Sequence, residues 1–506
     1  MQYARAVFTF LTFLLREAVV DPRGLIGKVR AKRGLPKWQP LFEPTEAELA
    51  EDGGEYRLAL KLASMKGRPS QRWRNALVRR RVENELWWLS QSIATSKTYL
   101  LSSEPRSTQV LYVAGNSLPY TNSGYSKRTH SLAKAVQSSG VAITVLTRLG
   151  YPSVVGVAVS KAAETVESLR YERNMQWRFP CDPRKEFEYA KKGIVEAARR
   201  HNATILHTTT SFKNAIVVAA AAQELHLPWV YETRGEIEKT WLTHSAYGRT
   251  SRTEESEHYR LWRAKEVEAA SAADGVVTLS NLAARRLIRK GIAGGDICVA
   301  PNSAEDDLFK RVISVDEARR LTGVEGDFIV GTITSVVEYE GLDTMIRALP
   351  HLPNSVKFLV VGDGIDRPRL EELTSDLGLS ERVTFVGRQP QDEIVPWYRT
   401  LDVFVVPRTN SPVCRTVTPI KPLAAMALGI PVVASDLPAL QEVTGGLATY
   451  FESENPEALA AAIRTVMRGP HRGRQAQEWA KGRTWSQIGY ILREFYSEIE
   501  NRRLTS

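Results

Sequence analysis

Short apolar, β-branched segments alternate with helical segments along most of the chain, and this alternation constrains the fold more than any other feature. A first series of strand-like segments covers residues 110–114, 141–147, 204–207, 229–231 and 275–279. A second series covers residues 328–333, 356–361, 383–386, 403–406 and 431–434. Helical patterns separate the strands, and repeated strand–helix–strand units build parallel sheets. Because 506 residues are too many for one core, the sequence predicts an α/β protein with two Rossmann-like, doubly wound lobes that face a cleft, roughly residues 108–300 and 303–470.

Residues 1–105 follow another pattern and are predicted to form a mostly helical, basic extension. Residues 1–100 contain 18 Lys+Arg and 10 Asp+Glu, so about eight of the eleven net positive charges lie there. One predicted helix presents a single apolar face, formed by Trp73, Leu77, Val78, Val82, Leu86 and Trp87.

An apolar run at residues 6–15 precedes a basic stretch at residues 23–37. The run is too short to span a bilayer and lacks the cleavage site of a signal peptide. Two interpretations stay open: a helix packed on the protein, or an interfacial helix on the inner face of the plasma membrane.

Cysteine usage and the lack of nucleic-acid motifs narrow the classes of protein and partner. The chain has only Cys181, Cys298 and Cys414, at unrelated spacings, which argues against a disulfide framework or a cysteine zinc site and favours the cytoplasm. The basic charge comes without a nucleic-acid-binding motif, so we expect an anionic membrane surface or a phosphorylated substrate and no nucleic acid.

Residues at predicted strand ends of the second lobe suggest a diphosphate site. Arg408 follows the strand 403–406, and Lys421 opens a predicted helix with Thr418 as its N-cap. Helix N-termini and nearby cations bind phosphate. A turn at Gly362, Asp363 and Gly364 follows the strand 356–361, and its glycines would let the backbone approach a ligand.

The first lobe has a second set of candidates. Glu232 and Arg234 emerge from the strand 229–231, and they suit either a structural ion pair or a hydroxyl-rich or acidic acceptor. His207 is predicted to end its strand, where a catalytic role gains weight over a structural one. The loop 119–128 leads into a helix after the first strand, where such folds bind ligands.

These motifs, in this order, resemble those of the retaining family 4 glycosyltransferases over residues 109–500. The matching segments include 123–130, 230–235, 273–280, 300–302, 339–343, 361–364, 385–388, 407–408 and 418–435. The resemblance implies a GT-B fold, no metal or other cofactor, and a UDP- or GDP-linked sugar as donor. It implies a hexosyl- or N-acetylhexosaminyltransferase that acts on a glycan, lipid-linked or small-molecule acceptor, as in polysaccharide biosynthesis.

The residue patterns and the resemblance together predict the roles of individual residues. The catalytic residues would be Arg408, Lys421 and His207. The donor would be bound by Gly362, Asp363, Gly364, Gly387, Arg388, Thr418 and Ser335. The acceptor would be bound by Gly124, Tyr125, Arg128, Glu232 and Arg234. Residues 471–506 would form a helix that returns to the first lobe with an apolar face of Trp485, Ile488, Ile491, Leu492 and Phe495.

Departures from the family pattern keep other functions open. Ser335 and Glu340 stand where many relatives have an arginine and a lysine, and Ala424 replaces the glutamate that usually holds the ribose. One alternative is therefore a catalytically weak or inactive homologue that acts as a binding or assembly subunit. Another is a different GT-B enzyme, such as an epimerase or a phosphorylase, which the ordered motifs make less favoured.

Overall fold

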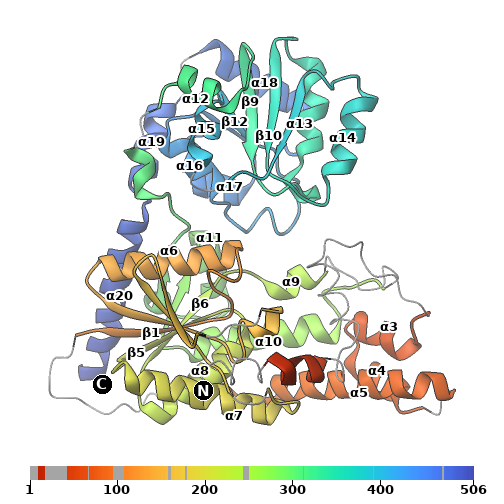
Figure 1. The fold of residues 1–506 in the computed structure, drawn as a ribbon, viewed down its shortest axis with the longest axis vertical. Coiled ribbons are helices and arrows are strands. Elements are labelled where there is room, and N and C mark those ends of the chain that lie inside the picture. Colours follow the sequence, from red (N-terminus) through yellow and green to blue (C-terminus); the bar gives the residue numbers. More distant parts are fainter. Residues whose placement is uncertain are drawn as a thin grey trace. The chain divides into compact units, whose positions relative to one another are not determined.

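The computed structural model divides into two compact units. The first comprises Met1–Thr278, Arg286–Val299 and Gly489–Ser506, and the second comprises Leu279–Arg285 and Ala300–Ile488 (Figure 1). The structure describes residues 10–17, 43–65, 68–94, 107–157, 161–176, 179–242, 250–310, 313–390, 393–469 and 472–505. The basic stretch 23–37 and residues 6–9 of the apolar run lie outside the described residues.

An eight-stranded sheet forms the centre of the first unit, in the order β3-β4-β2-β1-β5-β6-β7-β8. Its strands are β1 (Gln109–Ala114), β2 (Ala142–Thr147), β3 (Ala163–Val166), β4 (Leu169–Arg173), β5 (Ile205–Thr209), β6 (Trp229–Thr233), β7 (Gly275–Thr278) and β8 (Ile297–Val299). All neighbours pair in parallel except β3 and β4. The five predicted strands are confirmed, whereas β3, β4 and β8 were not predicted.

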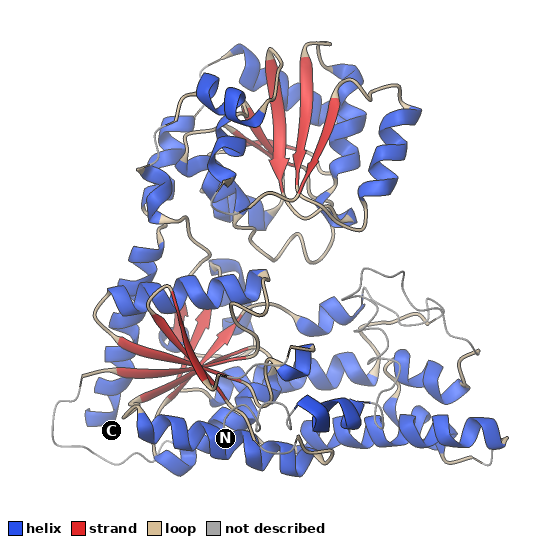
Figure 2. Cartoon of the chain, in the orientation of Figure 1, coloured by secondary structure: helices blue, strands red, loops and turns tan. Residues whose placement is uncertain are grey.

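Helices pack on both faces of this sheet (Figure 2). The helices of this part of the chain are α6 (Gly124–Ser138), α7 (Pro183–Arg200), α8 (Phe212–Leu225), α9 (Ile237–Leu242), α10 (Glu257–Ala272) and α11 (Asn281–Arg289), of which α9 contacts α10. Their apolar stripes meet the strands because a parallel sheet must be covered on both sides. For example, α8 buries Phe212, Ala215, Val218 and Ala222.

The second unit contains a six-stranded, entirely parallel sheet in the order β11-β10-β9-β12-β13-β14. Its strands are β9 (Phe328–Ile333), β10 (Val356–Val361), β11 (Val383–Gly387), β12 (Val403–Val406), β13 (Val432–Ser435) and β14 (Thr449–Phe451). Its helices are α12 (Val315–Thr322), α13 (Leu342–Ala348), α14 (Arg367–Asp376), α15 (Ile394–Arg399), α16 (Lys421–Ala427), α17 (Pro438–Thr444), α18 (Pro456–Arg468) and α19 (Gly473–Lys481). The five strands predicted for this lobe are confirmed, which makes the whole a two-lobed α/β fold.

The N-terminal helices share the hydrophobic core of the first unit. They are α3 (Glu46–Asp52), α4 (Tyr56–Ala63) and α5 (Pro69–Ser90), and Ala59, Val78 and Val82 are buried in one cluster with strand residues such as Leu111. Thr45 and Glu48 form a capping box at the start of α3. The prediction for α5 is wrong at Trp73, which is 55% exposed.

Stacked aromatic rings join this helical segment to the rest of the first unit. The His258 ring lies between the rings of Trp241 and Trp262, at centroid distances of 4.2 and 4.6 Å. Its Nδ1 is 2.6 Å from the Tyr56 hydroxyl in α4. Burial, with Arg252 and Lys213 nearby, lowers the pKa of His258 from 6.5 to about 3, so the folded protein holds this ring neutral.

We expect the protein to lose stability as the pH falls from 7 to 5. The folded-state pKa of His258 lies below its unfolded value, so its contribution is complete above about pH 6.5 and is lost as the pH falls toward 3. At about pH 5 this one group should cost about 2 kcal/mol of unfolding free energy. His258→Phe keeps a ring in the stack and removes the titrating group. In urea titrations at pH 7 and pH 5, the variant should therefore lose about 2 kcal/mol less unfolding free energy between the two pH values than the wild type does. An unchanged difference would contradict the prediction.

The C-terminal helix α20 (Trp485–Thr505) packs on the first unit from residue 489 onward. Phe495 and Ile499 surround the position of Gly275, and the Tyr496 hydroxyl is 2.7 Å from His207 Nδ1. The expected apolar face is correct at Leu492 and Phe495 but wrong at Ile491, which is 42% exposed.

Gly489→Ala is expected to destabilise the first unit, although alanine normally favours a helix over glycine by about 1 kcal/mol. A Cβ at Gly489 would lie 2.2 Å from the carbonyl oxygen of Ala135 in α6. Overpacking of this kind costs about 1–3 kcal/mol, to be measured by thermal unfolding. Gly124→Ala is the matched control, because a Cβ there meets nothing within 4 Å. Equal melting temperatures for the two variants would disprove the close crossing of α20 and α6.

Among the described residues, none of the helices has the length and apolar content needed to cross a bilayer.

Candidate active site

The predicted donor residues of the second unit gather at one edge of its sheet. β11, β10, β9 and β12 are consecutive neighbours, and in a parallel sheet their carboxyl ends share one edge. The segments that follow these four strand ends carry Arg388, the Gly362–Gly364 turn, Ser335 and Arg408. Residues more than 70 positions apart in the chain therefore lie along one edge of the sheet.

Arg408 makes a buried ion pair with Glu340. Its Nη2 and Nε donate to the two carboxylate oxygens at 2.6 and 3.2 Å, and Nη1 donates to the carbonyl of Val417 at 3.1 Å. Burial opposes the charge on Arg408, but Glu340 more than offsets it and raises the pKa of the guanidinium. Glu340 stands where many relatives have a cation, and the structure shows that its charge is neutralised by Arg408.

Lys421 begins the seven-residue helix α16, and its Nζ donates to the carbonyl of Ile333, the last residue of β9, at 3.0 Å. The predicted N-cap is wrong: Ile420 occupies that position, and the buried Thr418 hydroxyl has no hydrogen-bond partner among the described residues. An N-cap at Thr418 would start the helix at residue 419, so the observed start at Lys421 is two residues later than expected. Pro422 occupies the second helical position. A proline is accepted there because the first N–H groups of a helix have no internal partner.

The glycines after β10 are required by the protein's own backbone. A Cβ at Gly362, where φ is 138°, would lie 1.8 Å from the carbonyl oxygen of Thr334. A Cβ at Gly364 would lie 2.0 Å from that of Val336. The turn is thus locked against residues 334–336, the segment that follows β9. The sequence predicted that these glycines let the backbone approach a ligand closely. In the structure the backbone of the turn approaches residues 334–336 instead.

The other donor-side residues differ in exposure. Ser335 and Arg388 are exposed, and Gly387 has a positive φ of 84° at the end of β11. Asp363 accepts a hydrogen bond from the N–H of Gly364 at 2.9 Å. Ala424 lies half-buried on α16 against the core of this unit, and its methyl group cannot accept a hydrogen bond.

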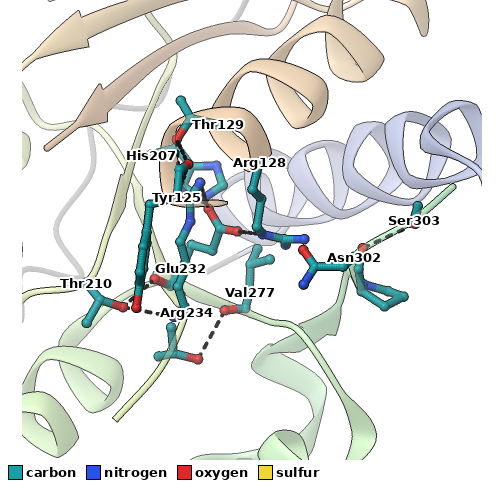
Figure 3. Close-up of polar contacts among 12 residues, drawn as sticks. Tyr125, Arg128, Thr129, His207, Thr210, Glu232, Arg234, Val277, Asn302 and Ser303 are labelled. Carbon is teal, nitrogen blue, oxygen red and sulfur yellow. Dashed lines mark hydrogen bonds and ion pairs between the residues drawn. The ribbon is translucent and has the colours of Figure 1, made fainter. Parts of the chain in front are cut away.

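The predicted acceptor residues of the first unit form a buried charge network (Figure 3). Glu232, at the end of β6, accepts from Arg128 Nε and Arg234 Nη2, both at 2.7 Å, and from the Tyr112 hydroxyl at 2.5 Å. Their side chains are at most 3% exposed. The two guanidinium groups lower the pKa of Glu232 despite its burial. These residues meet as predicted, but they bind one another, and Arg234 also donates to the carbonyl of Tyr125 and the hydroxyl of Thr129.

His207 lies inside the sheet and not at a strand end. β5 continues through two threonines to Thr209, because β-branched residues favour extended backbone. The His207 side chain is completely buried, and burial lowers its pKa to about 3. Its Nε2 is 3.9 Å from Glu232 and makes no hydrogen bond among the described residues. A neutral ring in this place supports the network and does not reach solvent.

Two polar side chains at the same edge of the first sheet were missed. Arg148 follows β2 directly and donates to the amide oxygen of Asn116, beyond the end of β1, at 3.1 Å. Both could have been found by the rule that selected Glu232, a polar residue just after a strand. Gly124 and the 52%-exposed Tyr125 open α6 and are the predicted acceptor residues that solvent reaches most easily.

Within the described residues, no group of three or more His, Cys, Asp or Glu side chains is arranged to hold a metal ion.

Two sequence profiles match the chain, one after the other. The family described as "Glycosyl transferase 4-like domain" matches residues 123–303, and "Glycosyl transferases group 1" matches residues 327–468. The first 122 residues fall outside both matches.

Curated relatives are similar over part of their length. A lipopolysaccharide core biosynthesis glycosyltransferase of Rhizobium meliloti is 35% identical over 25% of this chain and 34% of its own. A D-inositol 3-phosphate glycosyltransferase of Nocardia farcinica is 28% identical over 46% and 54%, respectively. A 2-deoxystreptamine glucosyltransferase of Streptomyces kanamyceticus is 28% identical over 41% and 54%. The chain thus spans about a third to a half of the length of these relatives.

Solved structures share the fold. Sucrose-phosphate synthase from Thermosynechococcus elongatus superposes with a TM-score of 0.59 at 19% identity, over 78% of this chain and all of that one. The Anabaena protein HepE in complex with UDP-glucose gives 0.58 at 18% identity, over 77% of this chain and 99% of that one. The chain therefore has the GT-B fold and carries a glycosyl transferase 4-like domain followed by a glycosyl transferases group 1 domain.

Proposed function

We propose that the protein is a retaining glycosyltransferase that moves a hexosyl or N-acetylhexosaminyl group from a UDP- or GDP-linked donor to a glycan, lipid-linked or small-molecule acceptor. The observation that carries the proposal is the single sheet edge in the group 1 domain on which separate donor motifs meet. Arg408 follows β12 and the Gly362–Gly364 turn follows β10, and Lys421, the first residue of α16, reaches the end of β9 between them.

The chemistry of this edge suits a departing diphosphate. Negative charge grows on the leaving group as the sugar–phosphate bond breaks, and fixed cations and N–H dipoles stabilise it. Arg408 and Glu340 together are neutral, so further positive charge would come from Lys421 and Arg388, whose side chains are exposed. A guanidinium has five N–H groups; three of those on Arg408 are used within the described residues, and two remain for a phosphate oxygen.

The acceptor would bind at the 4-like domain, near Tyr125 and the strand ends of β1 and β2. We propose only the class of the acceptor, a glycan, lipid-linked or small-molecule compound. The relatives' names support this class, because they mention lipopolysaccharide core, D-inositol 3-phosphate and 2-deoxystreptamine. We further propose that the protein works in the cytoplasm as a peripheral protein of the membrane's inner face.

Purified protein and a panel of nucleotide sugars test this function. The expected result is that one donor raises the melting temperature and is consumed with release of its nucleoside diphosphate. Product NMR should then show retained anomeric configuration. If a donor binds without turnover under any acceptor condition, Ala424 marks a binding subunit and the transferase proposal fails. Inversion of configuration would reject only the retaining mechanism.

A further inference from the structure

The α4–α5 hairpin carries an unusual concentration of positive charge. Between Tyr56 and Val82 the sequence has nine Lys or Arg residues and no Asp or Glu. This segment lies before both family matches, which begin at residue 123. Its charge is therefore unrelated to the motifs that define the two glycosyltransferase domains.

Four of these nine cations form ion pairs with carboxylates of the same chain. These carboxylates lie elsewhere in the first unit or in α5, and the pairs are Arg57 with Glu257, Arg74 with Glu48, Arg79 with Glu83, and Arg81 with Glu51. Lys61 and Arg68 are exposed, and no carboxylate among the described residues lies within ion-pair distance of either one. Positive charge therefore remains at the tip of the hairpin.

Large apolar side chains are exposed among these cations. Leu58, Met65 and Trp73 are 47%, 61% and 55% exposed. Leu58 and Lys61 are three residues apart on α4, so they share one side of that helix, and Met65 lies two residues beyond its end. Arg68 directly precedes α5, and Trp73 lies in the first turns of α5. The opposite side of the hairpin is the packed one, with Tyr56, Ala59, Val78 and Val82 buried.

We propose that the tip of the α4–α5 hairpin, formed by Leu58, Lys61, Met65, Arg68 and Trp73, is a docking surface for an anionic lipid bilayer. Tryptophan and long apolar side chains insert at the level of the headgroups, and lysine and arginine attract anionic lipids. Apolar and basic side chains without acidic neighbours match the chemistry of that surface. Protein–protein interfaces also use tryptophan and methionine but are depleted in lysine, so Lys61 beside these apolar side chains favours the bilayer.

This surface differs from the apolar run at residues 6–15. In that run Leu11 and Leu15 are 50% and 66% exposed, whereas Phe13 packs on Phe179. The inference deepens the peripheral membrane association proposed above by naming the surface and the charge of its lipids. It does not depend on glycosyl transfer, because vesicle binding is measured without a donor.

Flotation of the full-length protein with vesicles tests the proposal. Vesicles of phosphatidylglycerol and phosphatidylcholine should bind the protein, and vesicles of phosphatidylcholine alone should bind at least about tenfold less. The variants Met65→Ser/Trp73→Ser and Lys61→Glu/Arg68→Glu should each weaken binding to the anionic vesicles by about tenfold or more. Both replace exposed side chains, and their melting temperatures verify folding.

The control is Arg320→Glu/Leu321→Ser, which removes an exposed arginine and a 65%-exposed leucine from α12 in the second unit. It should bind vesicles like the wild type. Equal binding by all variants, or loss of binding only in Leu11→Ser/Leu15→Ser, overturns the proposal. A concentration-dependent dimer that Met65→Ser/Trp73→Ser abolishes, without vesicle binding, would identify a second copy of the chain as the occupant and also overturn it. Donor turnover measured beside flotation separates this failure from failure of the transferase function.

Discussion

Replacing Lys421 by alanine is expected to lower the turnover of the nucleotide sugar by about 10²–10³-fold, which is about 2.7–4 kcal/mol of transition-state stabilisation. Lys421 carries a positive charge outside the Arg408–Glu340 pair, and its Nζ lies at the end of β9. Its side chain is exposed, so the loss of its hydrogen bond to Ile333 should cost less than about 1.5 kcal/mol of stability. Rates and melting temperatures are measured on the same preparations.

Arg320→Ala is the matched control for this prediction. Arg320 is an exposed arginine on α12, which precedes β9 and so lies toward the amino end of that strand. It should retain the wild-type rate. If Lys421→Ala also retains it while binding the donor normally, the diphosphate site is elsewhere.

Arg408→Ala is expected to lower both rate and stability, because it leaves the Glu340 carboxylate buried without its partner. A comparison with Arg408→Lys separates the two effects. Lysine keeps the charge beside Glu340 but cannot supply the forked donors of a guanidinium. Relative to Arg408→Ala, we therefore expect Arg408→Lys to recover more of the lost stability than of the lost rate.

Replacing Glu232 by alanine should destabilise the protein by about 3–5 kcal/mol. Its carboxylate lies between Arg128 and Arg234, and all three side chains are buried. Removing it leaves two guanidinium groups out of water without an acidic partner, and breaking a buried pair from one side has this cost. Urea titration followed by circular dichroism measures the loss.

Glu196→Ala is the control on an exposed helix face. Glu196 is 50% exposed on α7 and lies 3.9 Å from Lys192, and such surface pairs contribute at most about 1 kcal/mol. A similar, small loss in both variants would show that the network around Glu232 is not held together by its charges.

The buried network explains why the first lobe's residues were harder to interpret from sequence than the second lobe's. A glutamate and an arginine two positions apart after a strand suit both an acceptor site and an ion pair. Glu232 and Arg234 form an ion-pair network because of Arg128, more than 100 residues earlier, and the hydroxyl of Tyr112. No local pattern encodes such distant partners. The same holds for Glu340, whose partner follows a different strand 68 residues later.

Trp73 and Thr418 show two further limits. Trp73 has helical spacing with the packed residues of α5, but the packed face follows Arg74, Val78 and Val82 instead. One position around a helix is about 100°, enough to move a side chain from core to solvent. Thr418 has the side chain of an N-cap, yet α16 starts two residues later than the capping pattern indicated, after Ile420.

The sequence by itself determined the two α/β lobes, ten of their strands, and the motifs that meet at the donor edge. It could do so because periodic burial along a strand or helix is a local property, and because parallel topology brings strand ends together. Only the tertiary structure decided which charges are neutralised. An ion pair depends on the distance between groups that the chain order leaves far apart, so Arg408 is paired with Glu340, Glu232 is enclosed by two arginines, and Trp73 is left in solvent.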